Sequence, residues 1–137
     1  MMFLRSLPLL VLLFSGKVLA YEFPIEVFEY VDGARVVAFI EERDIDKSLH
    51  WTPFEGSPPL SIADALASIQ KSLAADPGLA NAAFTEIELK RIPHHEMHWH
   101  YLVEMTTETG GDRKYHYFVV LMNGKVIQAM VRPEPLK

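Results

Sequence analysis

The chain of 137 residues contains no cysteine. That absence excludes a disulfide scaffold, a thiol nucleophile and a thiolate metal site. The chain also lacks a glycine-rich phosphate loop and a serine in a nucleophile-elbow pattern. Histidine and carboxylate pairs such as His98 and Glu96 exist, but an exposed strand offers no sheltered pocket for acid–base chemistry. We therefore expect no enzyme and assign no catalytic residues.

Positive charge is scarce, because 13 lysines and arginines stand against 18 acidic residues, for a formal net charge of −5. Two of the basic residues, Arg5 and Lys17, lie in an N-terminal segment that we expect to be removed, which leaves the rest of the chain more acidic. An acidic surface repels phosphate backbones and anionic lipid. We therefore expect neither nucleic acid nor a membrane surface as a partner.

The N-terminal apolar run, residues 7–14, is too short to span a bilayer, which takes about 20 residues. It follows Arg5 and precedes small residues that end in Val18 and Ala20, which is the order of a secretory signal peptide. No cysteine follows the run, so a lipidated anchor is excluded. We expect residues 1–20 to be a cleaved signal peptide and residues 21–137 to form a single periplasmic or secreted domain. A cysteine-free exported domain fits a bacterial source better than an animal extracellular module.

The first half of the mature chain predicts a β-hairpin and a helix. Residues 25–31 and 34–40 flank Asp32-Gly33, a pair typical of two-residue hairpin turns. Residues 51–59 contain three prolines and a glycine, which favour an extended connection. Ser61 and Asp64 then form a capping-box arrangement, which together with an apolar stripe predicts a helix over residues 62–75. The stripe consists of Ile62, Ala65, Leu66, Ile69 and Leu73.

The second half predicts four strands, over residues 84–92, 96–106, 115–122 and 125–131. The polar and glycine residues 108–112 and the pair Asn123-Gly124 predict turns between them. The predicted fold class is α+β. An antiparallel β-sheet, made of the N-terminal hairpin and a four-strand meander, is expected to pack on one α-helix.

The last hairpin also predicts which side chains share a face of the sheet. A two-residue turn at Asn123-Gly124 pairs Phe118 with Ala129 and Val120 with Ile127, and we expect this face to carry the helix. The opposite face is unusually apolar, and it contains Tyr115, Tyr117, Val119, Leu121, Val126 and Met130. It must be covered by the first hairpin, by a second copy of the chain in a homodimer, or by a partner.

Several segments together resemble PepSY-type exported bacterial domains. They are the helix start Pro59-Leu60-Ser61-Ile62-Ala63-Asp64-Ala65-Leu66, the acidic strand Thr85-Glu86-Ile87-Glu88-Leu89, the aromatic strand Trp99-His100-Tyr101-Leu102-Val103 and residues 119–126. The resemblance covers roughly residues 58–131. It implies a small helix-plus-antiparallel-sheet architecture related in shape to cystatins. It also implies a binding or inhibitory module, often of proteases, and it brings no catalytic residues with it.

Two sets of aromatic residues are candidates for binding a protein or peptide. Trp51 and Phe54 lie in a proline-bearing loop before the helix, and such loops can be recognition elements, although Trp51 can equally cap one end of the core. Tyr115 and Tyr117 belong to the apolar second face. We therefore expect an exported module that binds a protein or peptide through that face or through the Trp51 loop.

A histidine-rich strand suggests a different function, the binding of zinc or copper. His94, His95, Glu96, His98 and His100 lie within seven residues, and alternation places Glu96, His98 and His100 on one face. Imidazole suits both metals. Two other interpretations are open: Met97, Trp99 and Tyr101 fill the core while the histidines decorate the solvent face, or the histidines respond to pH. His116 is expected opposite Val103 or Glu104, away from this group.

Overall fold

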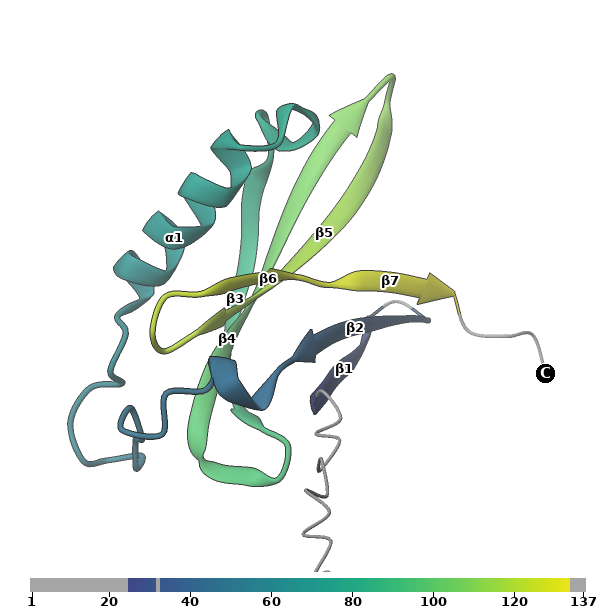
Figure 1. Cartoon of the computed structure of the whole chain (residues 1–137). Coiled ribbons are helices and arrows are strands. Elements are labelled where there is room, and N and C mark those ends of the chain that lie inside the picture. Colours follow the sequence, from purple (N-terminus) through teal and green to yellow (C-terminus); the bar gives the residue numbers. More distant parts are fainter. Residues whose placement is uncertain (1–24, 32, 134–137) are drawn as a thin grey trace, which may run out of the picture.

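The computed structural model describes residues 25–31 and 33–133, so the predicted signal peptide lies outside the described residues. Within them, one α-helix and two antiparallel sheets confirm the predicted α+β class (Figure 1). Two short 3₁₀ turns, Glu42–Asp44 and Pro77–Leu79, complete the regular structure of these residues. None of the helices in the described part of the chain is long and apolar enough to cross a membrane.

The first sheet has three strands, β1 (Ile25–Val31), β2 (Ala34–Ile40) and β7 (Met130–Pro133), in the order β1-β2-β7. Val31 pairs with Ala34, so the turn lies between these two residues and includes Gly33. Gly33 has a φ of 77°, a conformation that glycine adopts without steric cost. The hairpin predicted from the Asp-Gly pair is therefore confirmed at its predicted bounds.

The helix α1 runs from Ile62 to Ala74 and begins where the capping residues predict. The Ser61 side chain accepts a hydrogen bond from the Asp64 backbone N–H at 3.1 Å, which satisfies one of the free donors of the first turn. The buried residues of α1 are Ala65 and Ile69, one turn apart on the side that faces a sheet.

The second sheet is a meander of β3 (Ala83–Ile92), β4 (His95–Thr109), β5 (Asp112–Leu121) and β6 (Val126–Gln128). Strand β4 ends later and β5 begins earlier than predicted, because the turn between them has two residues and not the five predicted at 108–112. Gly110 and Gly111 have φ values of 61° and 87°, as a type I′ turn requires. His116 consequently pairs with Met105, one position beyond the expected Glu104.

The register predicted for the last hairpin is wrong by one residue. Val120 pairs with Val126, Val119 with Ile127 and Phe118 with Gln128. The Gly124 N–H donates to the Leu121 carbonyl at 2.8 Å and Gly124 has a φ of 86°, so the loop has three residues and ends in a bulge. A one-residue slip exchanges the faces of a strand, which places Val126 on the helix side and Ile127 on the other.

The strand predicted over residues 125–131 is in fact two strands in different sheets. Strand β6 ends at Gln128, and β7 then leaves β5 to pair with β2, with Val36 opposite Val131. Ala129 lies at the crossing, where its N–H donates to the Tyr117 carbonyl at 2.8 Å. The end of the chain therefore joins the two sheets, as the path of β6 and β7 in Figure 1 shows.

Two apolar cores make the domain three layers thick. One core lies between α1 and the meander, and it includes Ala65, Ile69, Val103, Phe118 and Val120. The other lies on the opposite face, where Val36, Ala38 and Ile40 of β2 pack against Leu102, Val119 and Leu121. The apolar second face is therefore covered by the first hairpin, which is one of the three alternatives left by the sequence.

Candidate functional site

The Trp51 loop, residues 51–59, is fixed to the start of β4 by its first residue. The Trp51 N–H donates to the Met97 carbonyl, and the Trp99 indole N–H donates to the Trp51 carbonyl, both at 3.0 Å. The Trp51 indole N–H donates to the Gly56 carbonyl at 3.1 Å, which closes the loop on itself. The two tryptophan rings meet edge to face, with centroids 5.0 Å apart. This irregular segment is thus held at several points, and Trp51 serves as its anchor.

Phe54 is the exception in this loop, because its side chain is fully exposed and its backbone has a φ of 72°. The Glu55 N–H donates to the Thr52 carbonyl at 3.1 Å, so Pro53 and Phe54 occupy the two central positions of a β-turn. With proline first and a positive φ second, this is the form of a type II turn, which favours glycine at the position of Phe54. A side chain there costs about 1 kcal/mol.

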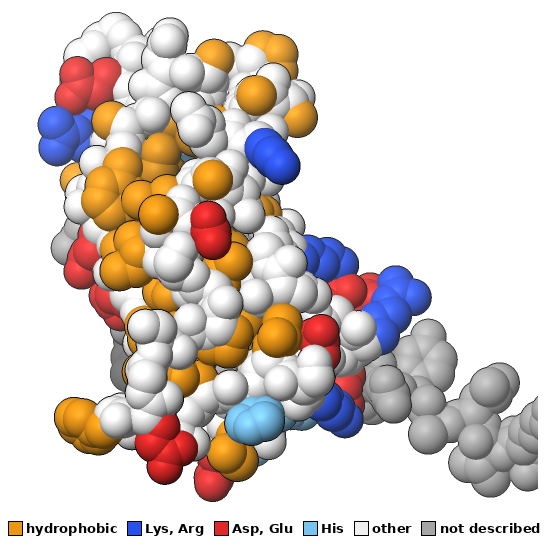
Figure 2. Space-filling model, turned by 90° about the vertical axis from the view of Figure 1, so that its left-hand side faces the viewer, with side chains coloured by type: hydrophobic (Ala, Val, Ile, Leu, Met, Phe, Trp, Pro, Cys, Tyr) orange, Lys and Arg blue, Asp and Glu red, His pale blue; other side chains and the backbone are white. Residues whose placement is uncertain are grey.

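An apolar groove begins three residues after Phe54 and has a volume of about 540 Å³. The end of the Trp51 loop and the start of α1 form one wall, with Ser57, Pro58, Ser61, Ile62 and Ala63. The sheet forms the other, with Ile87 and Leu89 of β3 and Tyr101 of β4. Figure 2 shows hydrophobic side chains gathered on the side of the molecule that carries α1.

Tyr101 ties the two walls of the groove together. Its hydroxyl donates to the Leu60 carbonyl at 2.6 Å, which links β4 to the residue before the helix cap. Burial of the ring raises the pKa of Tyr101, so the hydroxyl stays protonated and able to donate at neutral pH. At the rim, Ile62 keeps 53% of its surface exposed, although its place in the apolar stripe predicted a buried contact. The groove is therefore a fixed hollow with an apolar rim.

Strand β3 forms the outer edge of the meander, beside this groove. Among the described residues it pairs with β4 alone, from Ala83 to Ile92. Ile87 and Leu89 belong to the core under α1, so their neighbours Glu86 and Glu88 point to the opposite face of the sheet. Both glutamates are exposed, and Glu104 lies directly across from Glu86.

The structure separates the aromatic residues predicted to bind a partner. Trp51 and Phe54 share the loop beside the groove, whereas Tyr115 pairs with Thr106, roughly 20 Å farther along β4 than Trp99. Tyr117 is buried, and its hydroxyl donates to Glu104 Oε1 at 2.8 Å. β2 packs on the central part of the apolar second face, so binding of a partner there stays a prediction that concerns its uncovered part. Tyr115, at 41% exposure, lies beyond this cover.

His100 corrects the expectation that the histidines decorate the solvent face, because its side chain is 0% exposed. It lies across from Leu121 and Lys90, on the face that the first sheet covers. Neither ring nitrogen has a hydrogen-bond partner among the residues that the structure describes. Burial lowers the pKa of His100 to about 4, and the charge of Lys90 acts in the same direction. The Tyr101 backbone partly offsets the lowering of the His100 pKa, although it does not reach hydrogen-bond geometry with the ring.

The other histidines of the predicted metal site do not converge with His100. The His95 and His98 rings meet edge to face with centroids 5.9 Å apart, and His98 Nε2 lies 3.3 Å from the Lys47 carbonyl. His94 is exposed in the turn between β3 and β4, where it has a φ of 64°, and Glu96 is exposed as well. Within residues 25–31 and 33–133, no three histidine, aspartate or glutamate side chains are grouped to hold a metal ion. Zinc or copper binding stays a prediction without an assembled set of ligands.

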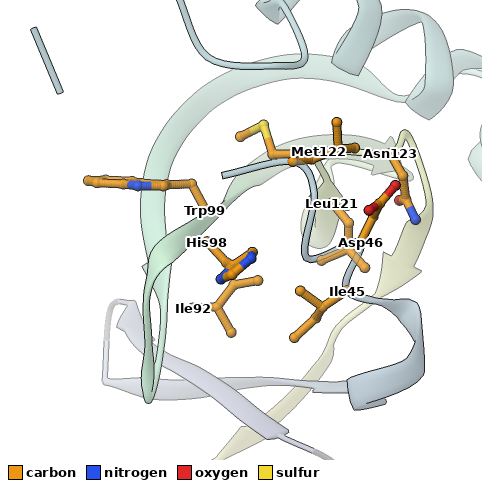
Figure 3. A pocket seen from close by; sticks show the side chains of 9 residues that line it. Ile45, Asp46, Ile92, His98, Trp99, Leu121, Met122 and Asn123 are labelled. Atoms are coloured by element: carbon orange, nitrogen blue, oxygen red, sulfur yellow. The ribbon is translucent and has the colours of Figure 1, made fainter. Parts of the chain in front are cut away.

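His98 does line a small cavity, which Figure 3 shows between β4 and the segment after β2. The His98, Ile92 and Ile45 side chains point into it, while Trp99 points away (Figure 3). Its volume is about 10 Å³, which is about the space that one water molecule needs. The groove beside α1, at about 540 Å³, is the larger hollow and has room for a ligand.

No protein-family model, curated protein or solved structure matches the chain. The resemblance to PepSY-type domains therefore stays a prediction. Sequence reasoning found the Trp51 loop but missed the groove, whose walls come from α1 and β3. No local pattern indicated the groove, because Ile62 lies on the apolar side of the helix and its exposure depends on how α1 meets the sheet.

Proposed function

We propose that this protein is an exported binding module that holds a protein or peptide segment against the Trp51 loop and the adjoining groove. Phe54 is the observation that carries the proposal. Its ring contributes nothing to the packing of the domain, because it is fully exposed, and its backbone is held in a conformation that disfavours any side chain. Strained residues cluster at binding and active sites, and the exposed ring makes Phe54 a candidate contact residue.

The energies favour a role for Phe54 in contact with a partner. Removing a phenylalanine side chain from water contributes about 1.5–3 kcal/mol, which exceeds the strain of about 1 kcal/mol at this turn. Aromatic side chains at the centre of an interface often dominate its affinity. The three hydrogen bonds of Trp51 hold the loop before a partner arrives, so little ordering remains to oppose binding. The groove beside the loop supplies further apolar area, in the range of volumes typical of ligand sites.

Site-specific photo-cross-linking tests the proposal. The photoreactive amino acid p-benzoylphenylalanine replaces Phe54 in cells that export the protein, and an otherwise identical chain carries it at Arg113. Arg113 is exposed in the turn region between β4 and β5, far along the sheet from the loop. We expect a discrete adduct at position 54 that is absent at position 113, and mass spectrometry then identifies the attached chain. Equal labelling at both positions, or none at position 54, would contradict the proposal.

A further inference from the structure

The outer edge of β3 is suited to accept another strand. Every second residue of an edge strand leaves its backbone N–H and C=O unpaired, and proteins usually protect such edges with short strands, bulges, charged side chains or covering elements. Strand β3 has ten residues, and its irregularities lie near the ends, between Phe84 and Glu86 and between Arg91 and Ile92. Pairing with β4 is continuous from Glu86 to Arg91, which leaves a regular edge of six residues.

The two faces of this edge differ in chemistry. On the side of α1, Ile87 and Leu89 line the groove together with Ile62. On the other side, Glu86 and Glu88 are exposed, with Glu104 opposite Glu86. Lys90 Nζ lies 3.7 Å from Glu88 Oε2 and ends the acidic run. Because side chains of a strand alternate between faces, an added strand would place every second residue in the groove and the others beside these glutamates.

A second copy of β3 fits this edge poorly. Antiparallel pairing of β3 with itself around Ile87 would bring Glu86 and Glu88 of one copy against the same residues of the other. Like charges opposite one another destabilise a sheet. The net charge of −5 for the chain adds to this repulsion over longer distances. The register centred on Leu89 sets Glu88 opposite Lys90 but leaves Glu86 opposite Ile92, so a different, basic chain complements the two glutamates better.

We propose that the groove and the β3 edge bind an extended segment in which apolar residues alternate with lysine or arginine, added to the sheet as a fifth strand next to β3. This inference rests on the proposed function, since it names the occupant of the same site. Backbone hydrogen bonds to β3 supply affinity, and the groove selects the apolar residues. The exposed charge pairs contribute only about 0.2–1 kcal/mol each, so they set preference and association rate more than affinity.

The test uses the exported chain and three fluorescein-labelled octapeptides, followed by fluorescence anisotropy at low salt. The first alternates valine and lysine, the second alternates valine and glutamate, and the third has the composition of the first in two blocks. We expect the alternating valine–lysine peptide to bind at least about tenfold more tightly than the other two, a difference of about 1.4 kcal/mol. N-methylation of alternate peptide bonds should abolish its binding, since it removes the donors that pair with β3.

Charge reversal provides the decisive comparison. The double variant Glu86→Lys/Glu88→Lys should exchange the preference, so that the valine–glutamate peptide binds more tightly. The matched control, Glu108→Lys/Asp112→Lys, changes the net charge equally at the exposed turn between β4 and β5 and should retain the original preference. Ile62→Glu places a charge at the groove rim and should weaken binding about tenfold; its half-exposed position keeps the fold intact.

Each outcome has a defined meaning. Binding that is equal for the alternating and block peptides, or that responds equally to both charge reversals, overturns the strand-addition proposal. Failure of all three peptides to bind at about 1 mM overturns it as well. A cross-link at position 54 together with any of these three results supports the binding function and rejects only the alternating basic occupant. A homodimeric adduct at position 54 would instead identify a second copy of the chain as the partner.

Discussion

The buried His100 makes the stability of the domain dependent on pH in a defined window. The imidazole has a pKa of about 6.5 in the unfolded chain and about 4 in the folded one, because burial disfavours the charged ring. As the pH falls from 6.5 to 4, the unfolded chain binds a proton at His100 that the folded chain does not bind. The folded state therefore loses stability over this window and has its full stability above it. The loss amounts to about 3 kcal/mol, at about 1.4 kcal/mol per pH unit.

The assay is urea denaturation of the wild-type chain and of His100→Leu at a series of pH values between 4 and 7.5. Leucine is similar in size, does not titrate and removes two buried nitrogens that have no partner. We expect the variant to be as stable as wild type or more stable at pH 7, and to lose about 3 kcal/mol less on acidification. Since total stability of a domain is about 5–15 kcal/mol, the effect is large enough to measure.

The difference between the two chains isolates His100 from other titrating groups. His116 also has a lowered pKa, mainly from burial and then from Lys114, and both chains retain it. The aspartates and glutamates are likewise common to both chains. Parallel stability curves for wild type and His100→Leu would refute the reasoning. They would mean that the His100 ring in the folded protein is hydrogen-bonded to a protein group or to water, so that burial does not lower its pKa.

Substitutions at three further positions test individual contacts of the fold and the site. Phe54→Gly should raise the free energy of unfolding by roughly 1 kcal/mol, because it relieves the strained turn without loss of packing, and it should also weaken peptide binding; denaturation and anisotropy measure the two effects. Ser61→Ala should lower stability by about 1 kcal/mol through loss of the helix cap, whereas Ser61→Thr should retain most of it, as thermal unfolding will show. Tyr117→Phe should lower stability by about 1–3 kcal/mol, because Glu104 loses the hydroxyl that donates to it, and an unchanged denaturation midpoint would mean that water replaces that bond.

Local signals determined the parts of the fold that could be predicted from the sequence. Asp32-Gly33 and the cap at Ser61 act through contacts within a few residues, so the first hairpin and the start of α1 follow from the sequence. Asn123-Gly124 was ambiguous, because the same pair suits a two-residue turn and a three-residue loop with a bulge. The choice depends on how β6 meets the rest of the sheet, and it decides which face Val126 occupies.

The features that sequence reasoning missed arise from contacts between distant segments. Alternation correctly placed His100 on the face opposite α1, but only the position of β2 makes that face an interior. The groove likewise exists because α1 and β3 are held apart at one end, with Tyr101 bonded to Leu60 between them. The local pattern of residues indicates neither the burial of His100 nor the groove, so both required the tertiary structure.

The crossing of the chain at Ala129 has a consequence for the order of folding. Val36 in β2 pairs with Val131 in β7, so the two partners are separated by nearly the whole described chain. Contacts between such distant segments slow folding, since the loop between them must close first. The first hairpin can form early, but its docking over His100 is completed only when the final strand reaches β2. During synthesis, the second core must therefore stay open until the last residues of the sheet have emerged.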